Sequence, residues 1–109
     1  MALGHIYQEQ ARFDLALTLY QQHPSHPAEI ATQFDNIGNV QLYRGQLDSA
    51  LTAYRRALDI YARHDHPRGR AVQASKMGQV FSKQARFDEA LQAHRDALAL
   101  YREFDLYLE

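Results

Sequence analysis

Histidines are the residues of this sequence whose type and spacing come closest to a metal site. His64 and His66 flank one residue, and His23 and His26 flank two, so that each pair could bring two imidazoles together. Both pairs fall in proline-containing segments, and neither has a clear third ligand at a helical spacing. We interpret them as polar turn residues and expect no metal ion and no cofactor.

The sequence gives catalysis little support. It contains no Cys, which excludes a cysteine nucleophile, a thiolate metal site and disulfide bonds. It has no glycine-rich phosphate loop and no nucleophile-elbow motif, and its acidic residues are scattered rather than paired. We therefore predict that the protein is not an enzyme.

Two amide side chains are better placed to bind than to catalyse. Asn36 and Asn39 are three residues apart, a spacing that places them on one face of a helix. An amide both donates and accepts hydrogen bonds, so such a pair suits the main chain of an extended peptide. The alternative is a solvated polar face without a ligand.

Composition limits the kinds of partner. A chain of 109 residues is long enough for one domain, and 12 basic against 13 acidic side chains give a net charge of -1. This balance argues against nucleic acid or a membrane surface as a partner. A hydrophobic content of 46% with 23% charged residues indicates a globular protein. With no visible signal peptide or membrane-spanning run, the sequence favours a cytoplasmic protein.

Internal repetition is the strongest signal in the sequence. Residues 31–69 and 71–109, aligned at an offset of 40, are identical at 13 of 39 positions. An offset of 34 adds a third copy at the N-terminus, in which Gly4 and Tyr20 match Gly38 and Tyr54. The chain is therefore predicted to be a repeat array with copies at about 1–27, 28–66 and 67–109.

Each copy contains two stretches in which apolar residues recur every three or four positions, as on one face of a helix. A short break separates the two stretches, and in the middle copy Gly45 stands where a helix end favours a left-handed residue. Pro24, Pro27 and Pro67 lie between copies, where they interrupt helices. The sequence thus predicts six helices, the first shortened, and no strand.

Small residues indicate how the helices of a pair approach each other. Gly4, Gly38 and Gly78 lie mid-helix, and an alanine follows each one twelve residues later, at positions 16, 50 and 90. A glycine that faces an alanine would let two antiparallel helices pack closely. His94 stands at a core position, where we expect a partly buried, hydrogen-bonded ring.

The residues Phe34, Ile37, Gly38, Ala50 and Tyr54, with Gly45 and Ala57, resemble the signature of the tetratricopeptide repeat. The 40-residue spacing and the run Asn36-Ile37-Gly38-Asn39 are similar to the repeats of kinesin light chains and of G-protein-signalling modulators. The resemblance implies an all-α, right-handed solenoid. It also implies a concave groove, lined by the first helix of each pair, that binds a peptide or protein segment without catalysis.

First-helix residues outside the core would line that groove. The candidates are His5, Gln8, Asp35, Asn36, Asn39, Tyr43, Lys76, Gln79 and Lys83. The family's clamp for a terminal carboxylate does not fit, since only Asn36 and Lys76 match its five positions. The groove is therefore predicted to take a peptide or protein segment, and binding of a chaperone's terminal carboxylate is not expected.

The end of the sequence suggests a second function. Its last residues are largely apolar, and no polar capping helix follows. Two interpretations fit: an excerpt of a longer array, truncated at both ends, or end faces that pair with another copy. We favour an excerpt whose isolated form self-associates. The candidate self-association residues are Phe104, Leu106, Tyr107 and Leu108. A homo-oligomer formed through terminal helices is thus the alternative to a peptide-binding adaptor, while an RNA-binding repeat is disfavoured by the balanced charge.

Overall fold

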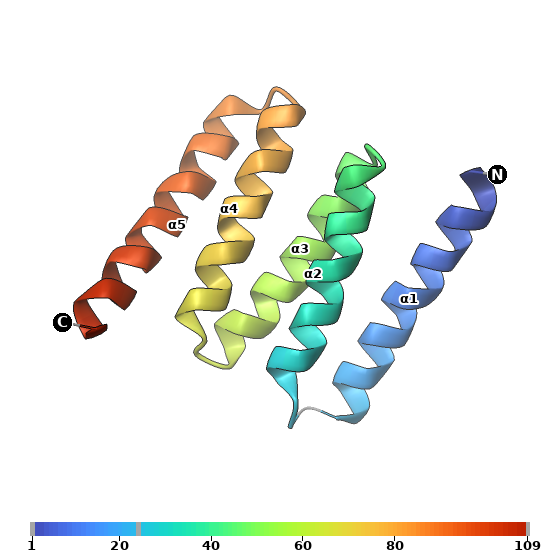
Figure 1. Cartoon of the computed structure of the whole chain (residues 1–109), viewed down its shortest axis with the longest axis horizontal. Coiled ribbons are helices and arrows are strands. Elements are labelled where there is room, and N and C mark those ends of the chain that lie inside the picture. The colour runs from blue at the N-terminus through green and yellow to red at the C-terminus, as the bar shows by residue number, and fades with distance from the viewer. Residues whose placement is uncertain (1, 24, 109) are drawn as a thin grey trace.

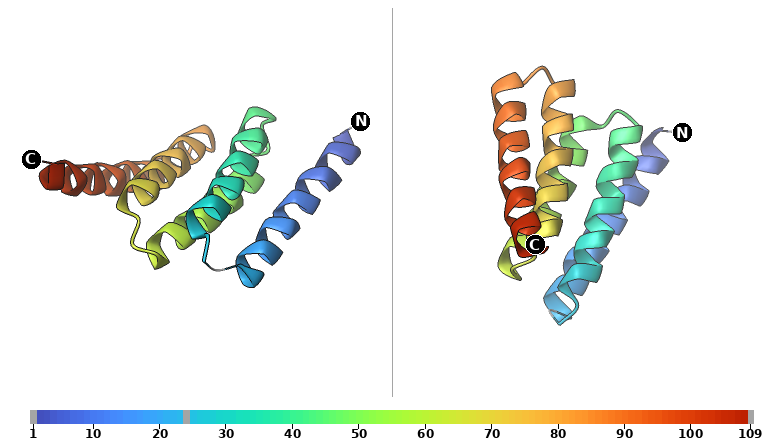
Figure 2. Two further views of the ribbon diagram at one scale, coloured as in Figure 1. Left: turned by 60° about the horizontal axis from the view of Figure 1, so that its bottom comes forward. Right: turned by 60° about the vertical axis from the view of Figure 1, so that its left-hand side comes forward.

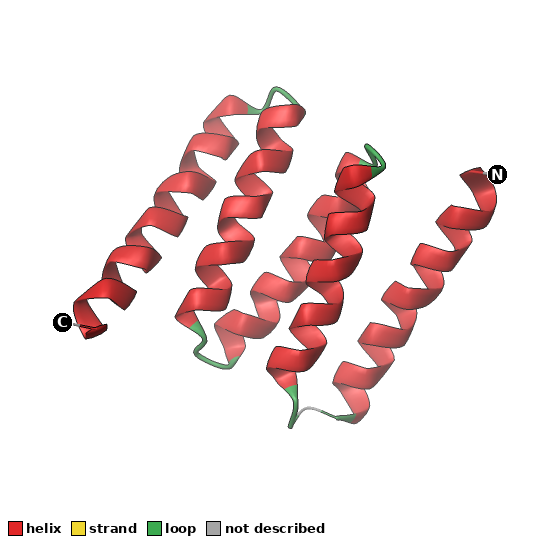
Figure 3. Ribbon diagram, in the orientation of Figure 1, coloured by secondary structure: helices red, strands yellow, loops and turns green. Residues whose placement is uncertain are grey.

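The chain is built from helices joined by short turns (Figures 1 and 3). The computed structural model describes the backbone of residues 2–23 and 25–108, and the side chains of residues 8, 10–23 and 25–103. This part of the chain contains no strand, and its five helices are α1 (Ala2–Gln22), α2 (Pro27–Tyr43), α3 (Leu47–Arg63), α4 (Pro67–Lys83) and α5 (Phe87–Leu108). The predicted all-α class is confirmed.

Successive helices run in opposite directions and follow one another across the molecule (Figure 1). The most extensive contacts join α2 to α3 and α4 to α5, and α3 packs on α4 to connect the two pairs. The result is a flat array of 49 × 37 × 16 Å, an α-solenoid seen from two further sides in Figure 2.

The turns that join α2 to α3, α3 to α4 and α4 to α5 share one stereochemistry. Gly45, Asp65 and Ala85 each follow a helix and have positive φ angles of 76°, 52° and 60°. The next N–H then reaches back over the helix end, as when Gln46 N donates to Gln41 O at 2.8 Å. This is the Schellman arrangement, which satisfies carbonyls at the end of a helix. The left-handed role predicted for Gly45 is confirmed.

Prolines begin the first helix of each complete pair. Pro27 and Pro67 are the first residues of α2 and α4, where a missing N–H costs nothing because it would have no helical partner. The His66 side chain caps α4, its Nδ1 accepting a hydrogen bond from Gly69 N at 3.0 Å. Turn and cap chemistry thus sets the bounds of the helices.

Two buried clusters hold the helices together. The first joins α1, α2 and α3 around the fully buried Phe34, and includes Ala16 and Ile60. The second joins α3, α4 and α5 around the fully buried Tyr54 and Val80. Because α3 contributes to both clusters, the two helical pairs share one continuous apolar layer.

The repeated glycines face aromatic rings rather than alanines. A Cβ atom added to Gly38 would lie 2.6 Å from the ring of Tyr54, and one added to Gly78 would lie 2.7 Å from the ring of His94. The prediction that these glycines face Ala50 and Ala90 is therefore wrong, because the nearest neighbour of each is the ring four residues further along the second helix.

His94 itself is exposed, and no hydrogen bond to its ring is found among the described residues. The expectation of a partly buried, hydrogen-bonded ring is therefore wrong. Its counterpart Tyr54 is buried because α4 packs over α3, whereas the outer face of α5 has no further described helix over it.

The first copy departs from the predicted pair of helices, since α1 runs unbroken from Ala2 to Gln22. The pentapeptide Gln10–Asp14 lies within this helix, although its sequence Gln-Ala-Arg-Phe-Asp is identical to that of Gln84–Asp88. The latter segment contains the turn between α4 and α5. The described chain consequently has five helices rather than six, and the same five residues adopt two structures.

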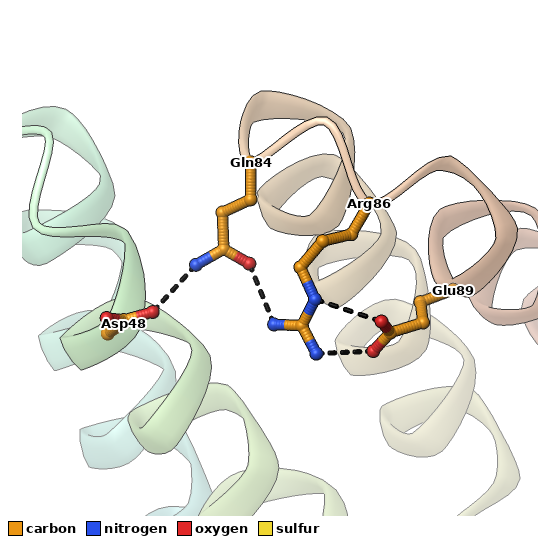
Figure 4. Close-up of polar contacts among 4 residues, drawn as sticks. All are labelled: Asp48, Gln84, Arg86 and Glu89. Atoms are coloured by element: carbon orange, nitrogen blue, oxygen red, sulfur yellow. Dashed lines mark hydrogen bonds and ion pairs between the residues drawn. The ribbon is translucent and has the colours of Figure 1, made fainter.

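Contacts outside the pentapeptide explain the difference (Figure 4). In the turn, Gln84 Nε2 donates to Asp48 of α3 at 2.8 Å, and the Arg86 guanidinium pairs with Glu89. In α1 the equivalent Gln10 Nε2 instead donates to Asp14 at 3.0 Å, one helical turn away and within the same helix. Gln10 therefore lacks the bond to a neighbouring helix that Gln84 makes, and the strain of a left-handed alanine is not offset in α1 by that contact.

Some predicted residues lie outside the described side chains. They are His5 of the groove set and Phe104, Leu106, Tyr107 and Leu108 of the self-association set. Among the described residues, no helix has the length and apolar character needed to cross a bilayer.

The turns give a paired test of the fold. Gly45→Ala places a Cβ in a left-handed conformation with nothing within 4 Å, so only the backbone conformation is penalised. We expect a loss of about 1 kcal/mol in the free energy of unfolding. Ala85→Gly removes the same penalty from the α4–α5 turn, and we expect it to raise the free energy of unfolding by up to about 1 kcal/mol. Urea denaturation measures both, and changes of the same sign would contradict this account of the turns.

Candidate functional site

A polar cluster links the two first helices, α2 and α4. Lys76 Nζ lies 2.6 Å from Asp35 Oδ1, and Gln73 Nε2 donates to the same oxygen at 3.0 Å. The Asp35 and Lys76 side chains are mostly buried, and Gln73 is almost completely so. Because the partners come from helices that are not adjacent in the chain, the cluster fixes the surface of α2 relative to that of α4.

Tyr54 connects this polar cluster to the apolar core. Its ring is fully buried over Gly38, while its hydroxyl donates to Asn39 Oδ1 at 2.6 Å. Lys76 Nζ lies 5.7 Å from the ring centroid, within range of a cation–π interaction. Burial, and then the nearby Asp35 carboxylate, raise the pKa of Tyr54 to about 12. The hydroxyl therefore stays protonated and fixes the orientation of the Asn39 amide.

Exposed side chains extend this polar surface along both helices. Tyr43 near the end of α2 is 93% exposed, and Gln79 and Lys83 are exposed on α4. Asn39 is exposed as well, and with its oxygen bound to Tyr54 its NH₂ group is left as a donor. The surface thus offers mainly hydrogen-bond donors to a ligand.

Asn36 and Asn39 have different surroundings. Asn36 lines a hollow of about 260 Å³ between α1 and α2, together with Leu15, Gln33 and Val40. Asn39 belongs instead to the cluster between α2, α3 and α4 through its bond to Tyr54. The structure therefore does not give the two amides one common environment, although both are exposed.

Gln8 was predicted to line the groove from a separate first helix. It is exposed, but it lies on the unbroken α1, the same helix that buries Ala16 against α2 and α3. The structure therefore gives the first copy no separate first helix to present Gln8.

The histidines between copies contact neighbouring side chains and backbone. His66 caps α4 and its ring lies against that of Tyr61, with centroids 4.9 Å apart. His64 Nε2 lies 3.2 Å from the Tyr20 hydroxyl, joining the end of α3 to α1. In the described part of the chain, no three His, Asp or Glu side chains are grouped as a metal site would require.

Two members of the polar cluster were not predicted from the sequence. The sequence pattern gives no reason to single out Gln73, and it places Tyr54 in the core without a role for its hydroxyl. The occurrence of glutamine at both position 33 and position 73, one repeat apart, is the signal that could have drawn attention to Gln73. Its Oε1 atom is buried and has no hydrogen-bond partner among the described residues.

Comparison with protein families identifies the array. A tetratricopeptide repeat model matches residues 28–103, and a second tetratricopeptide repeat model matches residues 1–25. The chain belongs to the tetratricopeptide repeat family. A search of curated proteins gave no match.

Repeats of this family generally mediate protein–protein interaction and typically act as non-catalytic scaffolds. The resemblance drawn from the spaced glycines, alanines and aromatic residues is thereby confirmed at the level of the family. The family alone does not specify which surface binds, so that question depends on the side chains.

The raised pKa of Tyr54 predicts how stability depends on pH. The folded chain holds this proton up to about pH 12, whereas the unfolded tyrosine loses it near 10.0. The contribution of Tyr54 is therefore complete below pH 10 and is lost as the pH rises from about 10 to about 12. We expect the free energy of unfolding to fall less steeply over this interval in Tyr54→Phe than in the parent chain. Tyr43→Phe, at an exposed position, is the control, and equal slopes for Tyr54→Phe and the parent would contradict the assignment.

The Asp35–Lys76 pair provides a second test. A double-mutant cycle with Asp35→Asn and Lys76→Met should give a coupling energy of about 1 kcal/mol, because both side chains are largely shielded from water. The more exposed Arg86–Glu89 pair is the control and should give about 0.3 kcal/mol. Urea denaturation at low and high salt measures both, and a coupling no larger than that of the control would contradict a role in joining α2 to α4.

Proposed function

We propose that this chain is a non-catalytic interaction module that binds an extended peptide segment across the polar surface of α2 and α4. The observation that supports this most directly is the Asp35 cluster. By joining the two helices through Lys76 and Gln73, it gives the exposed side chains on either side a fixed separation. A surface with fixed donors binds with a smaller loss of conformational entropy than a mobile one.

The hydrogen-bonding capacity of the surface suits a peptide main chain. Asn39 offers its NH₂ group while its oxygen is held by Tyr54, and Gln79 offers a complete amide on α4. Main-chain carbonyls are the acceptors that an extended peptide presents in every residue. The proposal therefore assigns peptide-carbonyl recognition to Asn39 and Gln79.

Charge narrows the class of peptide. Asp35 and Lys76 neutralise each other, while Lys83 is exposed and adds positive charge near the end of α4. The exposed Tyr43 ring adds an apolar surface on α2. We therefore propose a peptide with an acidic side chain positioned for Lys83 and an apolar one for Tyr43.

Asn39→Asp separates recognition from folding. The substitution keeps an oxygen that can accept from the Tyr54 hydroxyl but removes the NH₂ donors. We expect the helical content to be unchanged, and peptides selected by the parent chain from a displayed library to bind at least about tenfold more weakly. Asn39→Ala, which removes the whole amide from this surface, should weaken binding at least as much.

Exposed amides elsewhere provide the matched control. Gln21→Ala/Gln22→Ala removes two amides from the end of α1, away from the proposed surface, and should leave peptide affinity unchanged. Retention of affinity by Asn39→Asp, measured by fluorescence anisotropy with a selected peptide, would rule out this surface as the binding site.

A further inference from the structure

The hollow between α1 and α2 has a filled counterpart in the next copy. It is lined by Leu15, Leu19, Ile37 and Val40 among others, and Leu15 is 59% exposed. Each lining residue has an equivalent in the next copy, 34 positions later for the α1 residues and 40 positions later for the α2 residues. These equivalents lie on α3 and α4.

There the equivalent surface is covered by α2. Leu42 of α2 packs on the cluster that holds Ala50, Met77 and Val80. Asp35 of α2 bonds to both Gln73 and Lys76 of α4. The surface between α3 and α4 is therefore covered by α2, whereas the equivalent surface between α1 and α2 is an open hollow.

The chain carries a sequence that matches this helix. Residues 2–9 have leucine, glycine and isoleucine at positions 3, 4 and 6, where α2 has Ile37, Gly38 and Val40. Tyr20, in turn, stands at the position of Tyr54, whose ring covers Gly38. The segment that fits the hollow is therefore present in the chain.

This segment does not reach the hollow of its own copy, because α1 is continuous through the pentapeptide Gln10–Asp14. At about 1.5 Å per residue, an unbroken helix holds residue 5 roughly 22 Å from residue 20. A second copy placed antiparallel, with a two-fold axis near Ala11, can supply the missing helix and receive the same one in return.

We propose that two copies of this chain pair by exchanging residues 2–9, so that the first half of α1 from each copy fills the α1–α2 hollow of the other. The pairing goes beyond the proposed peptide binding, because it uses the α1 side of α2 and leaves Asn39, Gln79 and Lys83 free. It also assigns a function to the unbroken α1, which holds residues 2–9 away from the rest of their own chain.

Ala11 is the hinge, which makes the proposal testable by one substitution. Ala11→Gly favours the left-handed turn seen at Gly45 and Ala85 and disfavours the unbroken helix, so that residues 2–9 fold back onto their own copy. We expect sedimentation equilibrium to show a dimer for the parent chain. For Ala11→Gly we expect a dissociation constant raised by ~100-fold, about tenfold for each of the two hinges.

Ala85→Gly is the control, because it makes the same change in the α4–α5 turn and should leave the dissociation constant unchanged. Circular dichroism checks that Ala11→Gly remains folded. A parent chain that stays monomeric up to millimolar concentration would overturn the proposal. So would a dimer whose dissociation constant Ala11→Gly does not change.

Cross-linking identifies the exchanged segment independently. Residues 5 and 20 correspond to Asn39 and Tyr54, which are in contact. With no native Cys, the variant His5→Cys/Tyr20→Cys can be bridged by a short bismaleimide only at these two sites. Exchange predicts covalent dimers on a denaturing gel. Bridges confined to single chains, or no bridge at all, would overturn the proposal.

Discussion

The close approach of an aromatic ring to a helix backbone is the contact on which the rest of this array depends. Gly38 has no Cβ, so the ring of Tyr54 rests directly on α2, and the ring of His94 rests in the same way on Gly78 of α4. A glycine inside a helix costs about 1 kcal/mol relative to alanine. The packing of the paired helices offsets that cost, and it places the second helix at a distance that a larger residue would not allow.

The same contact connects the core to the polar surface. With its ring held over Gly38, the Tyr54 hydroxyl reaches Asn39, and the ring lies beneath Lys76. Lys76 pairs with Asp35, which ties α4 to α2. The geometry of the surface proposed to bind peptide is therefore set by core packing. This is why its donors hold fixed positions without any strand or loop to support them.

Much of the fold could be predicted from local sequence, and less of the site. Helical periodicity, the left-handed Gly45 and the prolines between copies all report on the backbone of their own segment. The partner of Gly38 and the bond between Tyr54 and Asn39 depend on the rotation of one helix against another, which a spacing does not encode. Asn36 and Asn39 likewise share a helix face by spacing, but their surroundings differ because α1 flanks one and α3 the other.

The sequence by itself determined that this protein is a helical repeat array with glycines and aromatic residues in register, because those features repeat within the chain. Only the tertiary structure decided what the repeated pentapeptide Gln-Ala-Arg-Phe-Asp becomes. At residues 84–88 it contains the turn that precedes the start of α5 at Phe87, where Asp48 of α3 and Glu89 bind its side chains, and at residues 10–14 it is part of a continuous helix, where Gln10 bonds to Asp14 instead. The left-handed alanine that the turn requires is stable only where neighbouring helices supply the contacts that offset its strain.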